Sequence, residues 1–311
     1  MAAQCRRAGT GFVTVRHAGF AWGLRARVIG PCQKRLATLP AVQKTPIAFV
    51  GGGNMAGALI GGLVRGGTPA QNLVVVEPFE AQREKLRQAH GVVAQATADE
   101  RLAAAGTVVW AVKPQLFAEA AAPCAPFIAG ALQISVMAGV RSAAIARASG
   151  SARVVRSMPN TPALIGRGIA GLFAAPAVTA AERAQAEALF APTGATLWVA
   201  HEENLDAVTA LSGSGPAYVF YVLEAMIQAG TELGLPAEQA RRLALATFDG
   251  AAALAAASTE TPQTLREQVT SKGGTTHAAI TALESSGVKS AFVRALHAAA
   301  QRADELGRDL G

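Results

Sequence analysis

Closely spaced small residues follow the first apolar run of the body of the chain and could hold a phosphate. The stretch "IAFVGGGNMAGALIGGL" (47–63) combines a buried-strand run, a glycine turn and an apolar helix. Gly51 allows a tight turn, Gly53 lets the backbone approach a pyrophosphate, and small Ala56 lets helix pack on strand. The helix N-terminus then offers N–H groups and a positive dipole end to the phosphates. Because strand, turn and helix come in this order, the motif predicts a dinucleotide cofactor, NADPH or NADH.

An acidic residue ends the next predicted strand. Glu77 lies 24 residues after Gly53, where a carboxylate can accept hydrogen bonds from a ribose 2′-hydroxyl. Its charge should repel a 2′-phosphate and so favours NADH, although Arg83 can offset that repulsion. The alternative is a solvated Glu at a strand end before Pro78.

Two later strand ends reach the edge of a parallel sheet where ligands bind. "AVKP" (111–114) ends one strand, and Lys113 either touches the cofactor or only precedes a helix begun by Pro114. "SVMAG" (135–139) ends the following strand in small residues that can admit a flat nicotinamide ring.

A second chemical stretch, "LREQVTSKGGTTHAAITALE" (265–284), lies near the C-terminus. The pattern predicts a helix that ends at Ser271–Lys272, a stop at two glycines, and a new helix capped by Thr275 or Thr276. Ordinary capping explains this pattern. Two hydroxyls beside several free backbone N–H groups also make a carboxylate site, and both interpretations stay open.

Weaker candidates carry hydroxyls or amides. Ser212 and Ser214 in "SGSGP" either form a proton path or cap a helix before Pro216. The loop "SMPNTPALIGRG" (157–168) suits positioning, but turn chemistry also explains it. The five histidines show no metal-ligand spacing, so no metal site is predicted.

The elements that would position these residues alternate between apolar runs and helical stretches. Seven strands are predicted, at 47–50, 72–77, 107–112, 132–137, 152–158, 168–174 and 195–200. This alternation predicts a parallel α/β sheet with helices on both faces. After about residue 205 only helices are predicted, with Pro216, Pro236 and Pro262 in first turns. We therefore expect a dinucleotide-binding Rossmann-like domain over 46–205 and an all-helical domain over 206–311.

The charge of the chain is concentrated at its start. The net charge is +7, but eight of the 28 basic residues and none of the 21 acidic residues lie in 1–45, which leaves 20 basic against 21 acidic. Nucleic-acid binding is therefore not expected. Residues 1–45 are expected to be a basic, disordered extension: a tail, an upstream read-through or a transit peptide. No membrane span is expected, and a single cysteine in the body, Cys124, indicates a reducing, cytoplasmic location.

These motifs together resemble the pyrroline-5-carboxylate reductase family. "PQTLREQVTSKGGTTHAAITALE" (262–284) is similar to the long signature of that family. "FVGGGNMAGALIGGL", "AVKPQ", "SVMAGV", "RSMPNTPALIGRG" and "ALSGSGPAYVF" agree in family order. The resemblance covers about residues 46–307 and leaves out the basic start of the chain.

The resemblance implies reduction of 1-pyrroline-5-carboxylate to L-proline, the last step of proline synthesis, by a homodimer with interlocking helical domains that in relatives can form decamers. It implies cofactor contacts at Gly51, Gly53, Asn54, Met55, Ala56, Ala111, Val112, Lys113, Pro114, Ala138 and Gly139, and substrate-carboxylate contacts at Gly274, Thr275 and Thr276. Two positions depart from the family pattern: Lys272 replaces a frequent proline, and Glu77 stands where NADPH-preferring relatives often have serine.

The implied chemistry fits the residues that the chain offers. Hydride addition to a protonated cyclic imine forms no alkoxide and needs no Tyr–Lys pair, and neither Tyr218 nor Tyr221 has a lysine four residues later. Positioning and electrostatics would then carry catalysis. The alternatives are a related imine or hydroxyacid reductase of the same architecture and a non-catalytic nucleotide-binding protein.

Overall fold

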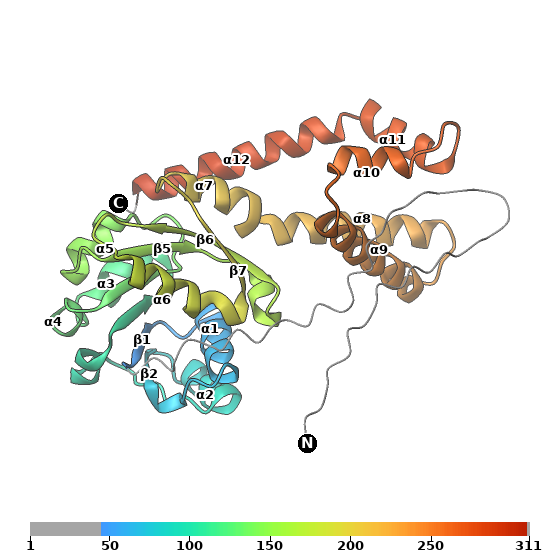
Figure 1. Cartoon of the computed structure of the whole chain (residues 1–311). Helices are drawn as coiled ribbons and strands as arrows, with labels where there is room; N and C mark the ends of the chain where they lie inside the picture. Colours follow the sequence, from blue (N-terminus) through green and yellow to red (C-terminus); the bar gives the residue numbers. More distant parts are fainter. Residues whose placement is uncertain (1–44, 310–311) are drawn as a thin grey trace, which may run out of the picture. The chain divides into compact units, whose positions relative to one another are not determined.

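The structure, a computed structural model, describes residues 45–309. The extension predicted over residues 1–45 lies outside the described residues, except for Thr45. All seven predicted strands are present: β1 (Ile47–Val50), β2 (Leu73–Val76), β3 (Thr107–Trp110), β4 (Leu132–Ser135), β5 (Val154–Met158), β6 (Gly168–Ala174) and β7 (Gly194–Trp198). They form one sheet in the order β2-β1-β3-β4-β5-β6-β7 (Figure 1).

The sheet is parallel in two blocks. Strands β1 to β5 pair in parallel, and β6 pairs in parallel with β7, but β5 and β6 run antiparallel. The sequence prediction of a parallel sheet therefore holds everywhere except at this one pairing. The reason is the short connection over residues 159–167, which contains only the 3-10 helix η4 (Thr161–Ile165). A parallel crossover needs a dozen or more residues, so this connection can only reverse the chain.

Helices cover the sheet in two groups. α1 (Asn54–Arg65) contacts α2 (Glu80–His90) and α6 (Ala180–Phe190). The second group consists of α3 (Phe117–Ala121), α4 (Ala125–Ile128) and α5 (Ser142–Ser149). The strands between them are almost fully buried, which explains why they appear in the sequence as continuous apolar runs and not as alternating ones.

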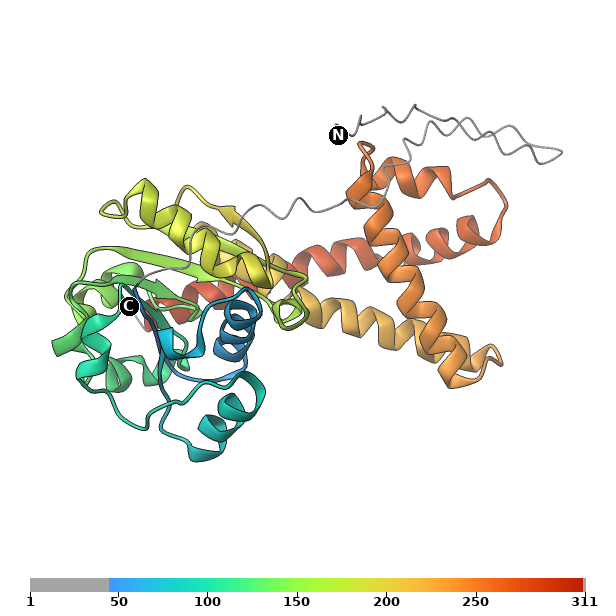
Figure 2. The ribbon, with the colours of Figure 1, turned by 60° about the horizontal axis from the view of Figure 1, so that its bottom comes forward.

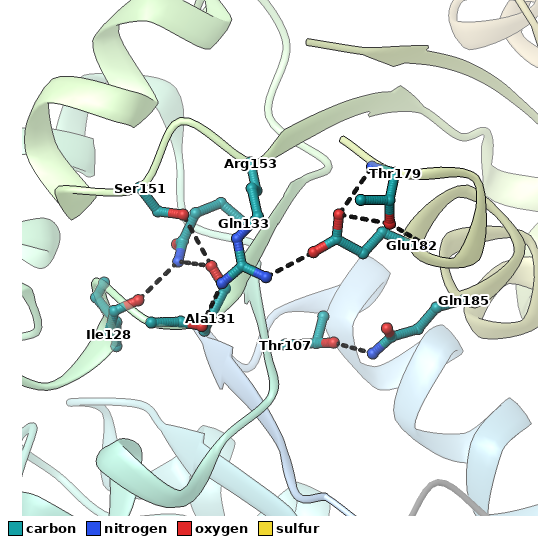
Figure 3. Close-up of polar contacts among 10 residues, drawn as sticks. Thr107, Ile128, Ala131, Gln133, Ser151, Arg153, Thr179, Glu182 and Gln185 are labelled. Atoms are coloured by element: carbon teal, nitrogen blue, oxygen red, sulfur yellow. Dashed lines mark hydrogen bonds and ion pairs between the residues drawn. The ribbon is translucent and has the colours of Figure 1, made fainter. Parts of the chain in front are cut away.

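The buried polar side chains of Trp110 and Gln133 pair with each other in the sheet. The indole N–H of Trp110 donates to Gln133 Oε1 at 2.9 Å, and Gln133 Nε2 donates to the carbonyls of Ile128 and Ala131 (Figure 3). Phe117 packs edge-on against Trp110 with ring centroids 5.1 Å apart. Because a buried polar group costs little once it is hydrogen-bonded, Gln133 can lie in a central strand.

Helices alone follow β7 within the described residues. They are α7 (Asn204–Val208), the π-helix η6 (Thr209–Gly213), α8 (Gly215–Glu232), α9 (Ala237–Ala257), α10 (Pro262–Gln268), α11 (Thr275–Ser285) and α12 (Val288–Asp309). Pro216 and Pro262 lie in first turns as predicted, whereas Pro236 is the N-cap residue of α9. Its fixed φ of −56° suits that position too. None of the described helices is long and apolar enough to cross a membrane.

The helices after η6 leave large apolar side chains exposed. Tyr221 of α8 is 74% exposed, Leu243 of α9 57% and Phe292 of α12 44%. Among all residues of α8 and α9, only Leu223, Ala240 and Ala244 are buried. A continuous apolar surface of this kind marks a protein–protein interface.

Candidate functional site

The glycine turn after β1 has the geometry that a dinucleotide needs. Gly51 has φ +95°, and a Cβ on it would lie 2.6 Å from the carbonyl oxygen of Ala111, so only glycine fits there. A Cβ on Gly53 would meet nothing within 4 Å, so this backbone is open to a ligand. Gly53 is the N-cap of α1 without a side-chain cap, and Ala56 is fully buried beneath it. The turn therefore presents free first-turn N–H groups, which fit a pyrophosphate.

Asn54 and Met55 form the first residues of α1, beside this open turn. Asn54 is exposed and Met55 is half-buried. Both lie where the cofactor contacts were predicted, and their roles stay predictions.

Glu77 holds the glycine turn from the neighbouring strand. It is only 6% exposed, so the alternative of a solvated strand-end glutamate is wrong. Its Oε2 accepts a hydrogen bond of 2.7 Å from Gly52 N, and its Oε1 accepts one of 2.9 Å from Phe79 N. The carboxylate thus fastens the phosphate-binding turn to the end of β2. A further bond from Glu77 to a ribose hydroxyl stays a prediction.

A cation binds the backbone that follows β2. Arg83 Nη1 donates to the carbonyls of Glu77, at 3.0 Å, and Pro78, at 2.6 Å. These bonds place positive charge beside the predicted ribose position, where it would favour a 2′-phosphate.

The other predicted cofactor residues follow β3 and β4. Ala111 N donates to Val50 O at 2.8 Å, which continues the pairing of β1 and β3 into the turn. Lys113 is exposed and precedes the 3-10 helix η3 (Pro114–Leu116), so the geometry of a helix start is confirmed and contact with the cofactor stays a prediction. Val112 and Pro114 are half-buried on either side of it.

Gly139 has a structural requirement of its own. Its φ is +80°, and a Cβ there would lie 3.3 Å from the carbonyl oxygen of Leu306 in α12. Ala138, next to it, is half-buried. Because β1, β3 and β4 are neighbours in the sheet, their carboxyl ends bring residues 51–56, 111–114 and 138–139 to one edge.

The "GGTT" stretch forms a helix start, but not the one predicted. α10 ends at Gln268 and not at Ser271–Lys272, and the N-cap of α11 is Gly274 with no side-chain cap. The prediction that Thr275 or Thr276 caps the helix is therefore wrong, because both already lie inside the first turn. Within residues 45–309 neither hydroxyl makes a hydrogen bond, and Thr276 is half-buried. The hydroxyls and the first-turn N–H groups remain able to bind an anion.

A single chain does not bring its two candidate half-sites together. α11 packs against α12. In both views it lies at the far end of the helical region from the edge formed by β1, β3 and β4 (Figures 1 and 2).

The two candidate serines lie at the π-helix. Ser212 Oγ donates to Val208 O at 3.0 Å, and Ser214 N donates to Thr209 O at 2.8 Å, whereas no side chain caps α8. Ser214 is the N-cap residue of α8, as the capping interpretation predicts, but its hydroxyl makes no cap hydrogen bond; the proton path stays a prediction. π-helical turns often occur at functional sites.

Asn160 joins this π-helix to the sheet. Its Nδ2 donates to Ser212 O at 3.2 Å and its Oδ1 accepts from Ile169 N at 3.0 Å. Asn160 and Ser212 also line an open, mostly apolar cavity of about 540 Å³ together with Tyr218 and Phe292. The two Asn160 bonds tie the loop to η6 and β6, and both a positioning loop and a plain turn remain compatible with them.

A group of charged residues behind the β4 edge was not among the residues predicted from the sequence. Arg141, Arg156, Glu202 and Asp206 form ion pairs there, with Arg156 3% and Asp206 8% exposed. Arg156 could have been noticed as a charge inside the apolar run "ARVVRSM". No group of His, Cys, Asp and Glu in residues 45–309 could hold a metal ion.

The fold and the glycine turn define the class of protein: a Rossmann-like dinucleotide-binding protein with a helical C-terminal region that exposes large apolar side chains. Two family models match the chain. One, described as pyrroline-5-carboxylate reductase dimerisation, matches residues 202–306, and one described as NADP oxidoreductase, coenzyme F420-dependent, matches residues 46–139.

Relatives extend the match to almost their whole length. The pyrroline-5-carboxylate reductase of Pseudomonas aeruginosa is 43% identical over 267 residues, 85% of this chain and 98% of its own. The solved structure from Coxiella burnetii has a TM-score of 0.78 at 36% identity and covers 84% of this chain and 98% of its own. That from Plasmodium falciparum, with NADP bound, has a TM-score of 0.78 at 26% identity and covers 86% and 99%. The chain therefore belongs to the pyrroline-5-carboxylate reductase family, which are NAD(P)-dependent oxidoreductases.

Proposed function

We propose that this protein reduces 1-pyrroline-5-carboxylate to L-proline, the last step of proline biosynthesis. The family match over nearly the full length of the relatives carries this proposal. The open backbone at Gly53 and the capless start of α11 support it, because they offer one site for a pyrophosphate and one for a carboxylate.

The residues of this chain would act by binding and orienting. When bound, NADPH or NADH supplies the hydride. The glycine turn and Glu77 fix the phosphate end, and the small residues Ala138 and Gly139 leave room beside the reacting carbon. Thr275, Thr276 and the N–H groups of α11 would hold the substrate carboxylate. Since the imine is already protonated and electrophilic, alignment of its carbon is the main task of the site.

The complete site needs two copies of the chain. The dimerisation model matches the helical region, and α11 lies far from the sheet edge of its own chain (Figures 1 and 2). We infer a homodimer in which α11 of one copy supplies Gly274, Thr275 and Thr276 to the cofactor edge of the other. Dimers could assemble further into a decamer. The Rossmann-like part would span 46–205 and the helical part 206–311. A cytoplasmic location is supported by the single buried, unpaired cysteine of the described residues, Cys124.

One assay tests the proposal. Oxidation of NADPH and of NADH is followed at 340 nm with 1-pyrroline-5-carboxylate, with the six-membered cyclic imine homologue as the competing substrate, and the product is identified as proline. We expect turnover with the five-membered ring. Preference for the six-membered ring would indicate a related imine reductase, and cofactor binding without turnover would indicate a non-catalytic protein.

A further inference from the structure

The loop between β4 and α5 is fastened to the helical region by charged groups. Arg141 Nη2 lies 2.9 Å from Asp206 Oδ2 and 3.5 Å from Asp304 Oδ1. The next residue, Ser142, donates from N and Oγ to the Glu202 carboxylate at 2.6 and 2.7 Å. Arg156 of β5 donates to the same carboxylate at 2.9 Å. We call Arg141, Arg156, Glu202 and Asp206 the ionic joint.

The ionic joint is a poor source of stability. Burial lowers the pKa of the Arg156 guanidinium, against the opposing effect of Glu202. Arg141 Nη1 and Arg156 Nε are buried without a hydrogen-bond partner among the described residues. Because desolvation offsets the attraction in buried ion pairs, replacing such pairs by apolar residues is often neutral or stabilising. The joint needs another explanation, and a fixed geometry is the one best supported for buried charges.

The ionic joint holds the loop after β4, which contains the predicted nicotinamide contacts. A Cβ on Gly139 would lie 3.3 Å from Leu306 O, and one on Gly307 would lie 2.6 Å from Arg141 Nη2. The end of α12 thus closes on the loop from one side while Asp206 holds Arg141 from another. Ala138 and Gly139 lie two to three residues before this clamp.

We propose that the ionic joint positions the 138–141 loop for hydride transfer, with Arg141 and Arg156 as positioning residues. This inference rests on the proposed function, since it assigns the loop to the nicotinamide end. In this arrangement the helical region, which forms the dimer, sets the geometry of the cofactor edge. The glycine turn between β1 and α1 makes none of the contacts of the ionic joint. Variants of the joint should therefore change hydride transfer without changing cofactor affinity.

Arg141→Met removes the charge and keeps much of the side-chain length. We expect kcat to fall about 10- to 100-fold, because a distant mutation that misplaces the reacting groups by about 1 Å can have an effect of this size. The Kd for NADPH should change by less than about threefold, since its phosphate contacts are untouched. The isotope effect with 4-deuterated cofactor should rise because hydride transfer becomes rate-limiting. Arg141→Lys should recover part of kcat. The double variant Asp206→Asn/Arg141→Met should lower kcat by less than the product of the two single-variant factors, because the two residues are in contact.

Arg153→Met is the matched control. Arg153 pairs with Glu182 at 2.6 Å, beside the first residue of β5 and so at the opposite end of the strand from the cofactor edge (Figure 3). Its loss should lower the unfolding midpoint and leave kcat and the isotope effect unchanged. If Arg141→Met behaves like this control, the positioning role is overturned.

A readout without turnover separates this inference from the proposed function. The fluorescence of bound NADPH reports the surroundings of the nicotinamide whether or not the substrate reacts. Arg141→Met should shift that emission and Arg153→Met should not. An inactive wild-type protein would overturn the proposed function alone, whereas identical emission from both variants and the wild type would overturn the joint.

Discussion

Glu77, beside the glycine turn, combines a structural role with a predicted role in cofactor choice. Glu77 is predicted to accept hydrogen bonds from a ribose hydroxyl, yet its two oxygens already accept hydrogen bonds from Gly52 N and Phe79 N. Hydrogen bonds to a charged acceptor contribute about 1.5–3 kcal/mol each, so this carboxylate orders the turn, and its charge is predicted to repel a 2′-phosphate as well. Arg83, which donates to the carbonyl of Pro78 after β2, is predicted to act in the opposite direction.

Glu77→Ser should therefore have two effects. Loss of the charge should raise the ratio of kcat/KM for NADPH to that for NADH, and loss of the two hydrogen bonds should weaken binding of both cofactors. Glu84→Gln is the control, since Glu84 is an exposed acid of α2 that pairs with Arg87. The experiment compares both kcat/KM values for all three proteins. A ratio that does not move in Glu77→Ser would refute the repulsion.

Thr276→Val should damage use of the substrate and spare cofactor binding. The hydroxyl does not cap α11, so its loss should cost little stability. If it donates to the substrate carboxylate, kcat/KM should fall by about one to two decades, which corresponds to ~1.5–3 kcal/mol. KM for pyrroline-5-carboxylate, Kd for NADPH and the unfolding midpoint are measured on one preparation. An unchanged kcat/KM would remove Thr276 from the site.

At the scale of elements, the turn between β1 and α1 separates two roles of glycine. Gly51 has φ +95° and is in close contact with Ala111, whereas Gly53 has φ −65° and faces open space. Gly51 is required by the backbone conformation, whereas Gly53 is predicted to make room for the ligand.

Gly51→Ala should consequently lower stability, whereas Gly53→Ala should weaken cofactor binding. We expect Gly51→Ala to lower the unfolding free energy by more than about 1 kcal/mol, because alanine is strained at positive φ. Gly53→Ala should leave stability within about 0.5 kcal/mol of wild type and weaken NADPH binding, since its methyl group occupies the pyrophosphate approach. Urea denaturation without cofactor and calorimetric titration with NADPH check the pair. Equal NADPH affinity of Gly53→Ala and wild type would place the pyrophosphate elsewhere.

At the scale of the whole molecule, the apolar helices and the distant α11 are the reasons for our proposal that association completes the site. α8, α9 and α12 expose large apolar side chains, and the dimerisation model spans the same helices. In the closed dimer that we propose, those surfaces would be buried and each cofactor edge would receive an α11 from the other copy.

Mixed dimers test this arrangement directly. A dimer of one Gly53→Asp chain and one Thr276→Val chain, isolated through two different tags, retains one site with both wild-type halves. We expect about half of the wild-type activity from it. A dimer of one doubly substituted chain and one wild-type chain should be nearly inactive, because each of its sites lacks one half. The reverse pattern of activities would show that each chain uses its own α11.

The local sequence pattern alone determined the strands, the glycine turn and the start of α11. Apolar runs placed all seven strands, because a buried parallel strand needs apolar residues on both faces wherever it lies. The glycine turn was also readable, since a positive φ and a close backbone approach demand glycine at Gly51. The start of α11 was located to within a residue, but not its cap, because capping depends on backbone angles that composition does not fix.

Only the tertiary structure decided the rest. Arg141 and Asp206 are 65 residues apart, and Gly52 and Glu77 are 25 apart, so no local periodicity reveals their pairing. The same holds for α11, whose sequence marks an anion site but not the distance to the cofactor edge. Spacing along the chain encodes helices, strands and turns, whereas contacts between distant segments depend on how those elements pack. The ionic joint and the need for a second copy arise from that packing.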